Sequence, residues 1–101
     1  MAEFEIKTDY REDTLYMEWI GRLRADNVSQ VIEAIKSFPQ MVNAEIDCSG
    51  LEYIASAGLG GLLVVIKTAQ GNGGKVAMKN VSDLVAEPLA LTGYDKMVEM
   101  E

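Results

Sequence analysis

One serine in this chain stands where a hydroxyl could receive or display a phosphate. Ser56 lies within residues 47–61, between two apolar runs of different period. The run before it alternates, which predicts a strand, and the run after it follows the i, i+3, i+4, i+7 spacing of one helical face: Val42, Ala44, Ile46 and Cys48, then Leu59, Leu62, Leu63 and Ile66. The first amides of a helix lack partners within it and attract anions. The pattern therefore predicts a hydroxyl at a helix N-terminus.

Other site chemistry finds little support in the sequence. The chain holds no histidine, so it lacks the commonest general base and every Ser-His or Cys-His nucleophile. Cys48 is the only cysteine, and its place in an alternating run predicts a buried strand residue. Asp47 is better explained as a turn-stabilising residue than as a catalytic acid, and residues 58–61 match no nucleotide-binding pattern. We predict no catalytic residue, no metal site and no cofactor.

Size and charge narrow the class of protein further. At 101 residues and 49% apolar content, the chain can form one domain with a single core. Sixteen acids against nine scattered bases give a net charge of −7, which disfavours nucleic acid as a partner. No apolar run approaches the roughly 20 residues that span a bilayer, so we predict no membrane insertion. Residues 1–5 are acidic and lack the basic start of a signal peptide, which predicts a cytoplasmic protein.

Hydrophobic periodicity predicts the N-terminal half as two strands and a helix. Residues 4–8 and 15–19 alternate, which is typical of half-buried strands, and the polar residues 9–13 between them predict a hairpin loop. Gly21 is expected to break the second strand. Asp26 or Asn27 can then cap a helix that stops before Pro39.

The C-terminal half alternates strands with helices. A short strand is expected to reach about residue 47 and turn at residues 49–50, before a central helix over residues 56–69. A strand over residues 75–78 follows. Ser82 or Asp83 can cap a last helix that ends at residues 91–93, with Pro88 kinking or restarting it, and residues 94–100 are expected as a short edge strand or tail.

The predicted order of elements defines the fold class. Helical crossovers join neighbouring parallel strands, whereas the first two strands form an antiparallel hairpin. We therefore expect an α/β fold, a mixed β-sheet with an antiparallel edge hairpin and helices mainly on one face. No linker or internal repeat interrupts residues 1–101, so the domain spans the whole sequence.

Three motifs in this order resemble the STAS domain family of anti-sigma-factor antagonists. The central motif of that family is similar to this chain at Asp47, Ser49, Ile54, Ala55, Ser56, Ala57, Gly58 and Leu59. Residues 21–23 resemble the family's Gly-x-Leu, and residues 91–97 resemble its closing Leu-Thr-Gly-Leu-Asp-Lys-Leu. The resemblance covers the chain almost end to end, and it implies a STAS domain over residues 1–101.

The resemblance implies a regulatory function. Ser56 would be phosphorylated by a partner, an anti-sigma factor with serine kinase activity, and a PP2C-type phosphatase would reverse the modification. Unphosphorylated, the domain would bind that partner and release a sigma factor. A phosphoserine carries about −1.5 to −2 charges, so on a docking surface it can expel a partner without unfolding the domain. The residues expected to bind the partner are Arg24, Asp26, Ala55, Ser56, Ala57, Gly58, Leu59 and Gly60.

Several alternatives remain open at this stage. Many phosphorylated members have acids where this chain has Ala55 and Arg24, which indicates a changed partner specificity or poor phosphorylation. Those two residues also favour a STAS adaptor subunit of a lipid or solute transporter assembly. A small-molecule or nucleotide sensor could bind a ligand at the same helix N-terminus. Ser56 could also be a simple N-cap, a role commoner among serines than phosphorylation. In each of these interpretations the protein is not an enzyme.

Overall fold

The computed structural model describes residues 4–101, and its elements follow the predicted order. The expectation about the acidic start rests partly on residues 1–3, which lie outside the described residues. The strands are β1 (Phe4–Arg11), β2 (Thr14–Leu23), β3 (Asn43–Ile54), β4 (Val76–Lys79) and β5 (Glu99–Met100). The helices are α1 (Val28–Lys36), α2 (Leu59–Gly71) and α3 (Asp83–Thr92), with short 3-10 helices η1 (Ala25–Asn27), η2 (Ser56–Gly58) and η3 (Tyr94–Lys96).

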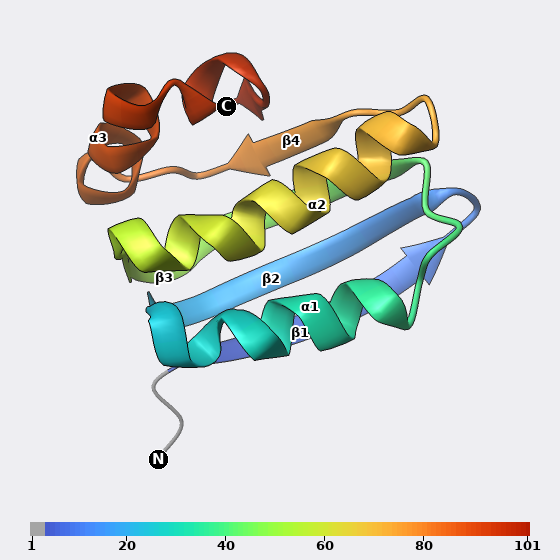
Figure 1. Ribbon diagram of the computed structural model, residues 1–101, viewed down its shortest axis with the longest axis horizontal. Helices are drawn as coiled ribbons and strands as arrows, with labels where there is room; N and C mark the ends of the chain where they lie inside the picture. The colour runs from blue at the N-terminus through green and yellow to red at the C-terminus, as the bar shows by residue number, and fades with distance from the viewer. Residues whose placement is uncertain (1–3) are drawn as a thin grey trace.

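The five strands form one mixed sheet in the order β1-β2-β3-β4-β5. The β1–β2 hairpin is antiparallel, and each later neighbour pairs in parallel. Helices α1 and α2 lie side by side over one face of this sheet, and α3 lies near the end of β3, with which it is in contact (Figure 1). The predicted fold class, with its antiparallel edge hairpin, is confirmed.

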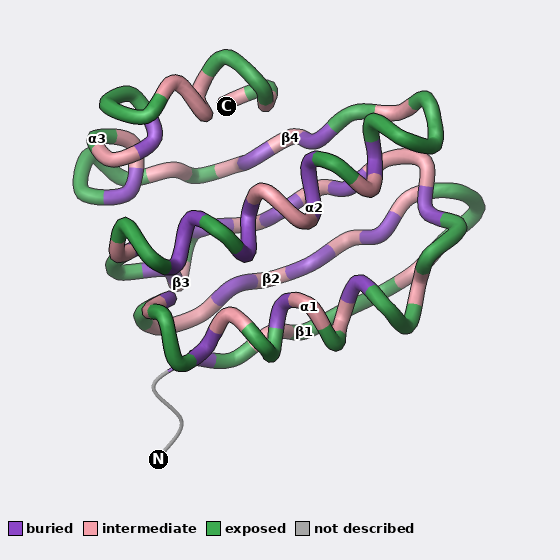
Figure 2. Tube along the Cα trace, in the orientation of Figure 1, coloured by how far each residue is buried: buried purple, intermediate pink, exposed green. Residues whose placement is uncertain are grey.

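The core lies between the sheet and helices α1 and α2. Alternate residues are buried in the first six positions of β2 and β3, as the period-2 pattern predicts (Figure 2). The core consists of residues from β1 to β4 and from the inner faces of the helices, among them Leu15, Met17, Trp19, Val31, Ile46, Cys48, Leu62 and Ile66. Cys48 is buried, as predicted, with 1% of its surface exposed.

The hairpin and β3 are longer than predicted. The loop expected at residues 9–13 shrinks to a tight turn in which Glu12 has φ 58°, and β2 continues through Gly21 at φ 98° to Leu23. β3 passes through the expected turn at residues 49–50 because its pairing with β2 resumes after the first of two register shifts and ends with Leu23 opposite Ile54. The predicted loop at residues 9–13, strand break at Gly21 and turn at residues 49–50 were therefore wrong. In each case pairing between strands extends the strand through residues that favour a turn.

The C-terminal predictions are closer to the structure. The Ser82 hydroxyl accepts a hydrogen bond from the amide of Val85 and so caps α3, which ends at Gly93 with φ 82°. Pro88 lies inside this helix and does not restart it. β5 is the short edge strand expected after it. Over the described range 4–101, every helix is too short or too polar to cross a bilayer.

Candidate functional site

The turn that presents Ser56 is anchored to the end of β2. Ala55 is extended, with φ −76° and ψ 157°, and its amide donates to the carbonyl oxygen of Leu23 at 2.9 Å. The amides of Gly58 and Leu59 both donate to the carbonyl oxygen of Ala55, at 2.8 and 3.2 Å. We call residues 55–58 the Ser56 loop. These bonds fix its path between β3 and α2.

Gly58 allows the Ser56 loop to lie directly against β2. A Cβ atom at this position would approach the Leu23 carbonyl oxygen to 2.5 Å, which no ordinary packing tolerates. Because η1 begins two residues after Leu23, this approach also brings η1 into contact with η2. Two turns that are far apart in sequence therefore form one continuous surface.

The eight predicted partner-binding residues lie in and around these two turns. Asp26, Ser56, Ala57 and Gly60 are exposed, and Arg24 and Ala55 are half-buried. Gly58 and Leu59 are buried, so they support the surface from beneath. The structure brings the whole set together, and their role in partner binding stays a prediction.

Ser56 does not cap a helix. Ala55 occupies the N-cap position of η2 and Gly58 that of α2, and neither helix has a side-chain capping hydrogen bond. The interpretation of Ser56 as an N-cap was therefore wrong. Its hydroxyl is exposed at the start of a helix and is not committed to holding that helix together.

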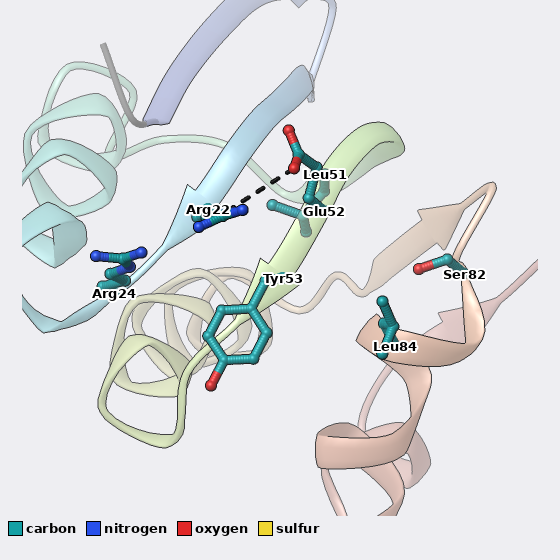
Figure 3. A pocket seen from close by; sticks show the side chains of 7 residues that line it. All are labelled: Arg22, Arg24, Leu51, Glu52, Tyr53, Ser82 and Leu84. Atoms are coloured by element: carbon teal, nitrogen blue, oxygen red, sulfur yellow. Dashed lines mark ion pairs between the residues drawn. The ribbon is translucent and has the colours of Figure 1, made fainter.

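Two clefts flank the end of β3 beside this loop. The larger, of about 620 Å³, lies between the end of β2 and the start of α3 (Figure 3), and it is lined by Arg22, Arg24, Leu51, Glu52, Tyr53, Ser82 and Leu84. The smaller, of about 220 Å³, contains Ser56 together with Tyr53, Ile54, Leu84, Glu87, Pro88 and Leu91. Tyr53 and Leu84 belong to both, so the clefts form one grooved surface next to the serine.

This surface carries exposed apolar side chains that sequence reasoning missed. Tyr53 is 45% exposed, Leu84 68% and Leu91 80%. Large apolar side chains gathered next to one another are typical of protein–protein contact surfaces. Tyr53 has the outward position that alternation from Ile46 and Cys48 would give it, because the two register shifts between β2 and β3 cancel. It was missed because the strand was expected to end at about residue 47.

The charges around the clefts are mixed. Arg22 and Glu52, which both line the larger cleft, form an ion pair, Nε to Oε1 at 3.8 Å (Figure 3). Glu87 lines the smaller cleft with Ser56, so an added phosphate would meet a carboxylate and apolar side chains there. Over residues 4–101 no cluster of three or more Cys, Asp or Glu side chains could hold a metal ion.

Asp47 has a structural role, but not the predicted one of stabilising a turn at the strand end, because β3 continues past it to Ile54. Its Oδ1 accepts hydrogen bonds from the Ser49 amide at 3.0 Å and from Asn80 Nδ2 at 3.1 Å. The bond from Asn80, followed by that from Ser49, lowers the pKa of the carboxyl below its usual value. Asp47 thereby ties β3 to the segment that follows β4.

The fold and this surface define a class of protein: a single α/β domain that presents a helix-terminal serine beside an apolar groove. The family described as "Mlab, STAS domain" matches residues 6–99. The chain belongs to this STAS domain family, as its three motifs suggested.

Solved structures support the same fold. The anti-sigma factor antagonist SpoIIAA in its unphosphorylated form is 19% identical and superposes with a TM-score of 0.80 over 97% of this chain and 87% of that one. An anti-sigma factor antagonist from Mycobacterium paratuberculosis is 18% identical, with a TM-score of 0.81 over 96% and 84% of the two chains. The phosphorylated form of the Bacillus cell fate determinant SpoIIAA is 16% identical, with a TM-score of 0.73 over 97% and 90%.

Proposed function

We propose that this protein is a cytoplasmic anti-sigma-factor antagonist, switched by phosphorylation of Ser56. In this proposal it binds an anti-sigma factor with serine kinase activity and so regulates transcription that depends on a sigma factor. A PP2C-type phosphatase restores the unphosphorylated form. The protein is then the substrate of an enzyme and not an enzyme itself. The observation that carries the proposal is the exposed hydroxyl of Ser56, which caps no helix and lies beside the groove of Tyr53 and Leu84.

The physical basis of the switch is a change of charge on a docking surface. Phosphorylation adds about −1.5 to −2 charges, which a helix N-terminus tolerates in the free protein. In a complex, the same phosphate would be pressed between a partner, the carboxylate of Glu87 and the apolar side chains of the groove. Burying a charge that has no partner is costly, so the complex is destabilised and the free protein is not.

Capture and phosphorylation of the protein test this proposal directly. The tagged protein is used to capture its partner from an extract of its own cells, and the partner is identified by mass spectrometry. Incubation of the pair with Mg-ATP should then place one phosphate on Ser56, and a PP2C-type phosphatase should remove it. Ser56→Ala should abolish the modification, whereas Ser29→Ala, which removes an exposed serine from the first turn of α1, should not. Phosphate on another residue, or on none, overturns the proposal.

Two substitutions of similar size separate charge from bulk. Ser56→Asp introduces a negative charge, and Ser56→Asn introduces a neutral side chain of nearly the same shape. Ser56→Asp should weaken binding to the captured partner by about tenfold or more, since unpaired buried charges commonly cost several kcal/mol. Ser56→Asn should bind the partner much more tightly than Ser56→Asp. Equal affinities of these two variants would show that charge at this position is not the switch.

A second candidate is an adaptor subunit of a lipid or solute transporter assembly. Ala55 and Arg24 favour it, because both replace acids that many phosphorylated members carry at these positions. The high exposure of Leu84 and Leu91 also suits a partner that remains bound. Capture experiments distinguish the two candidates, since recovery of an ATPase subunit in place of an anti-sigma kinase supports the adaptor.

A further inference from the structure

The sheet has one long open edge. Of its two edge strands, β5 has two residues, whereas β1 has eight and, within residues 4–101, pairs with β2 alone. β1 lies at the edge of the sheet beside α1 (Figure 1). An edge strand presents unpaired backbone amides and carbonyls that can pair with another strand. The side chains of β1 therefore determine which strand could be added there.

The charged side chains of β1 alternate in sign along one face. Glu5, Lys7, Asp9 and Arg11 are all exposed, and their spacing of two residues places them on the face opposite α1 and α2. Arg11 Nε and Asp9 Oδ2 already form an ion pair at 3.0 Å on this face. The resulting order along the strand is negative, positive, negative, positive.

We infer that two copies of this chain associate through β1, antiparallel and centred on Thr8, to form one continuous sheet. In that register Glu5 of each copy lies opposite Arg11 of the other, and Lys7 lies opposite Asp9. Each contact occurs twice because the two-fold axis passes between the two Thr8 residues. Ile6 and Tyr10 are paired in the same way on the side that faces the helices.

Charge selects this register over its neighbours. A shift by two residues in one direction places Lys7 opposite Lys7 and Glu5 opposite Asp9. The same shift in the other direction places Asp9 opposite Asp9 and Lys7 opposite Arg11. Like charges directly opposite each other destabilise a strand pair. A shift by one residue would turn every side chain of the added strand to the wrong face.

A groove beside β1 can receive the apolar side chains of the second copy. It has a volume of about 440 Å³ and lies between β1 and α1, lined by Ile6, Thr8, Gln30, Glu33, Ala34, Ser37 and Phe38. Tyr10 stacks on Phe38 at one end, with ring centroids 5.3 Å apart. In the dimer, Ile6 and Tyr10 of the second copy lie next to this groove, so the strand pair gains apolar contact as well as hydrogen bonds.

Disulfide trapping tests the register. With mild oxidation, Thr8→Cys should form a covalent dimer of twice 11.1 kDa, because the two introduced thiols face each other across the two-fold axis. The only native cysteine, Cys48, is buried and does not compete. Glu5→Cys is the matched control on the same edge and should form no covalent dimer, because that position faces Arg11 of the second copy. Absence of the Thr8→Cys dimer, or equal cross-linking of both variants, overturns the register.

Charge reversal tests the interface in solution without a covalent bond. In sedimentation equilibrium, Lys7→Glu should raise the dimer dissociation constant by about tenfold or more, since two attractive cross-strand pairs become repulsive. The double variant Lys7→Glu/Asp9→Lys should recover most of the loss. Lys67→Glu, the same charge change at an exposed position of α2, should leave the constant unchanged. A wild-type protein that stays monomeric at its highest soluble concentration, or a Lys7→Glu variant that dimerises like it, overturns the inference.

Discussion

Replacing Gly58 with alanine tests whether the Ser56 loop is held against β2. The added Cβ would lie 2.5 Å from the Leu23 carbonyl oxygen, 3.0 Å from its carbon and 3.1 Å from Leu23 Cγ. The oxygen belongs to the backbone of a strand end, and Leu23 is fully buried, so neither can rotate away. The loop itself must move, and the bond from the Ala55 amide to Leu23 is then strained or lost.

The structure allows the cost of this substitution to be bounded. Overpacking of this kind costs about 1–3 kcal/mol. Loss of the Ala55–Leu23 hydrogen bond adds about 1 kcal/mol. Gly58 has helical dihedral angles, φ −70° and ψ −22°, so alanine recovers about 0.5–1 kcal/mol of backbone entropy. We therefore expect Gly58→Ala to lower the free energy of unfolding by about 1–3.5 kcal/mol.

Gly60→Ala is the matched control for this measurement. Gly60 is exposed in the first turn of α2, and a Cβ there would meet no atom within 4 Å. Alanine at this position should raise the free energy of unfolding by about 0.5–1 kcal/mol. Urea unfolding of both variants should therefore move the midpoint in opposite directions at unchanged m-value. If Gly58→Ala proves as stable as Gly60→Ala, the close approach of the loop to β2 is not a constraint and the reasoning fails.

Two further predictions concern Cys48 and Asp47. Burial raises the pKa of the Cys48 thiol to about 12, so iodoacetamide at neutral pH should label it only as the protein unfolds in urea, and rapid labelling of the native protein would contradict this. Because the pKa of Asp47 is lowered in the folded protein, its carboxylate stabilises the fold at pH values above the usual pKa of 3.8. This contribution is lost as the pH falls through the pKa of the folded state. The destabilisation caused by Asp47→Ala should thus shrink when urea unfolding is repeated under acidic conditions, and a constant difference would show that the Asp47 charge contributes nothing.

The hydrophobic periodicity predicted the order of the strands and helices, but it did not predict their lengths. The alternation in β1 and β2 and the helical spacing after Ser56 both arise because the side chains that face the core are apolar. The type and order of the elements could therefore be predicted. Asp9 and Arg11 are charged, yet they extend β1, because the exposed face of an edge strand needs no apolar side chains, and Tyr10 between them packs against the core. Ser49 and Gly50 suit a bulge as well as a turn, and only the continued pairing of β3 with β2 selects the bulge.

The sequence predicted the residues around Ser56 but not the apolar side chains of the groove beside it. Ser56 and its neighbours form one local motif, so sequence reasoning could place them at a helix N-terminus. Tyr53 and Leu84 come together only in the folded chain, because β3 continues past its expected end to Tyr53 and the path after β4 brings Leu84 beside it. Contacts between distant segments leave no local signal in a single sequence.

The anchoring of the Ser56 loop decides what kind of switch phosphorylation can be. The Ser56 hydroxyl makes no capping bond, so its modification does not uncap the helix. The loop is instead fixed through the backbone of Ala55 and the absence of a side chain at Gly58. A phosphate at Ser56 therefore changes the charge and size of a surface that stays in place. Ser56→Asp should then unfold at nearly the same urea concentration as the wild type while losing affinity for the partner, and a large loss of stability would instead indicate that the switch works by rearranging the loop.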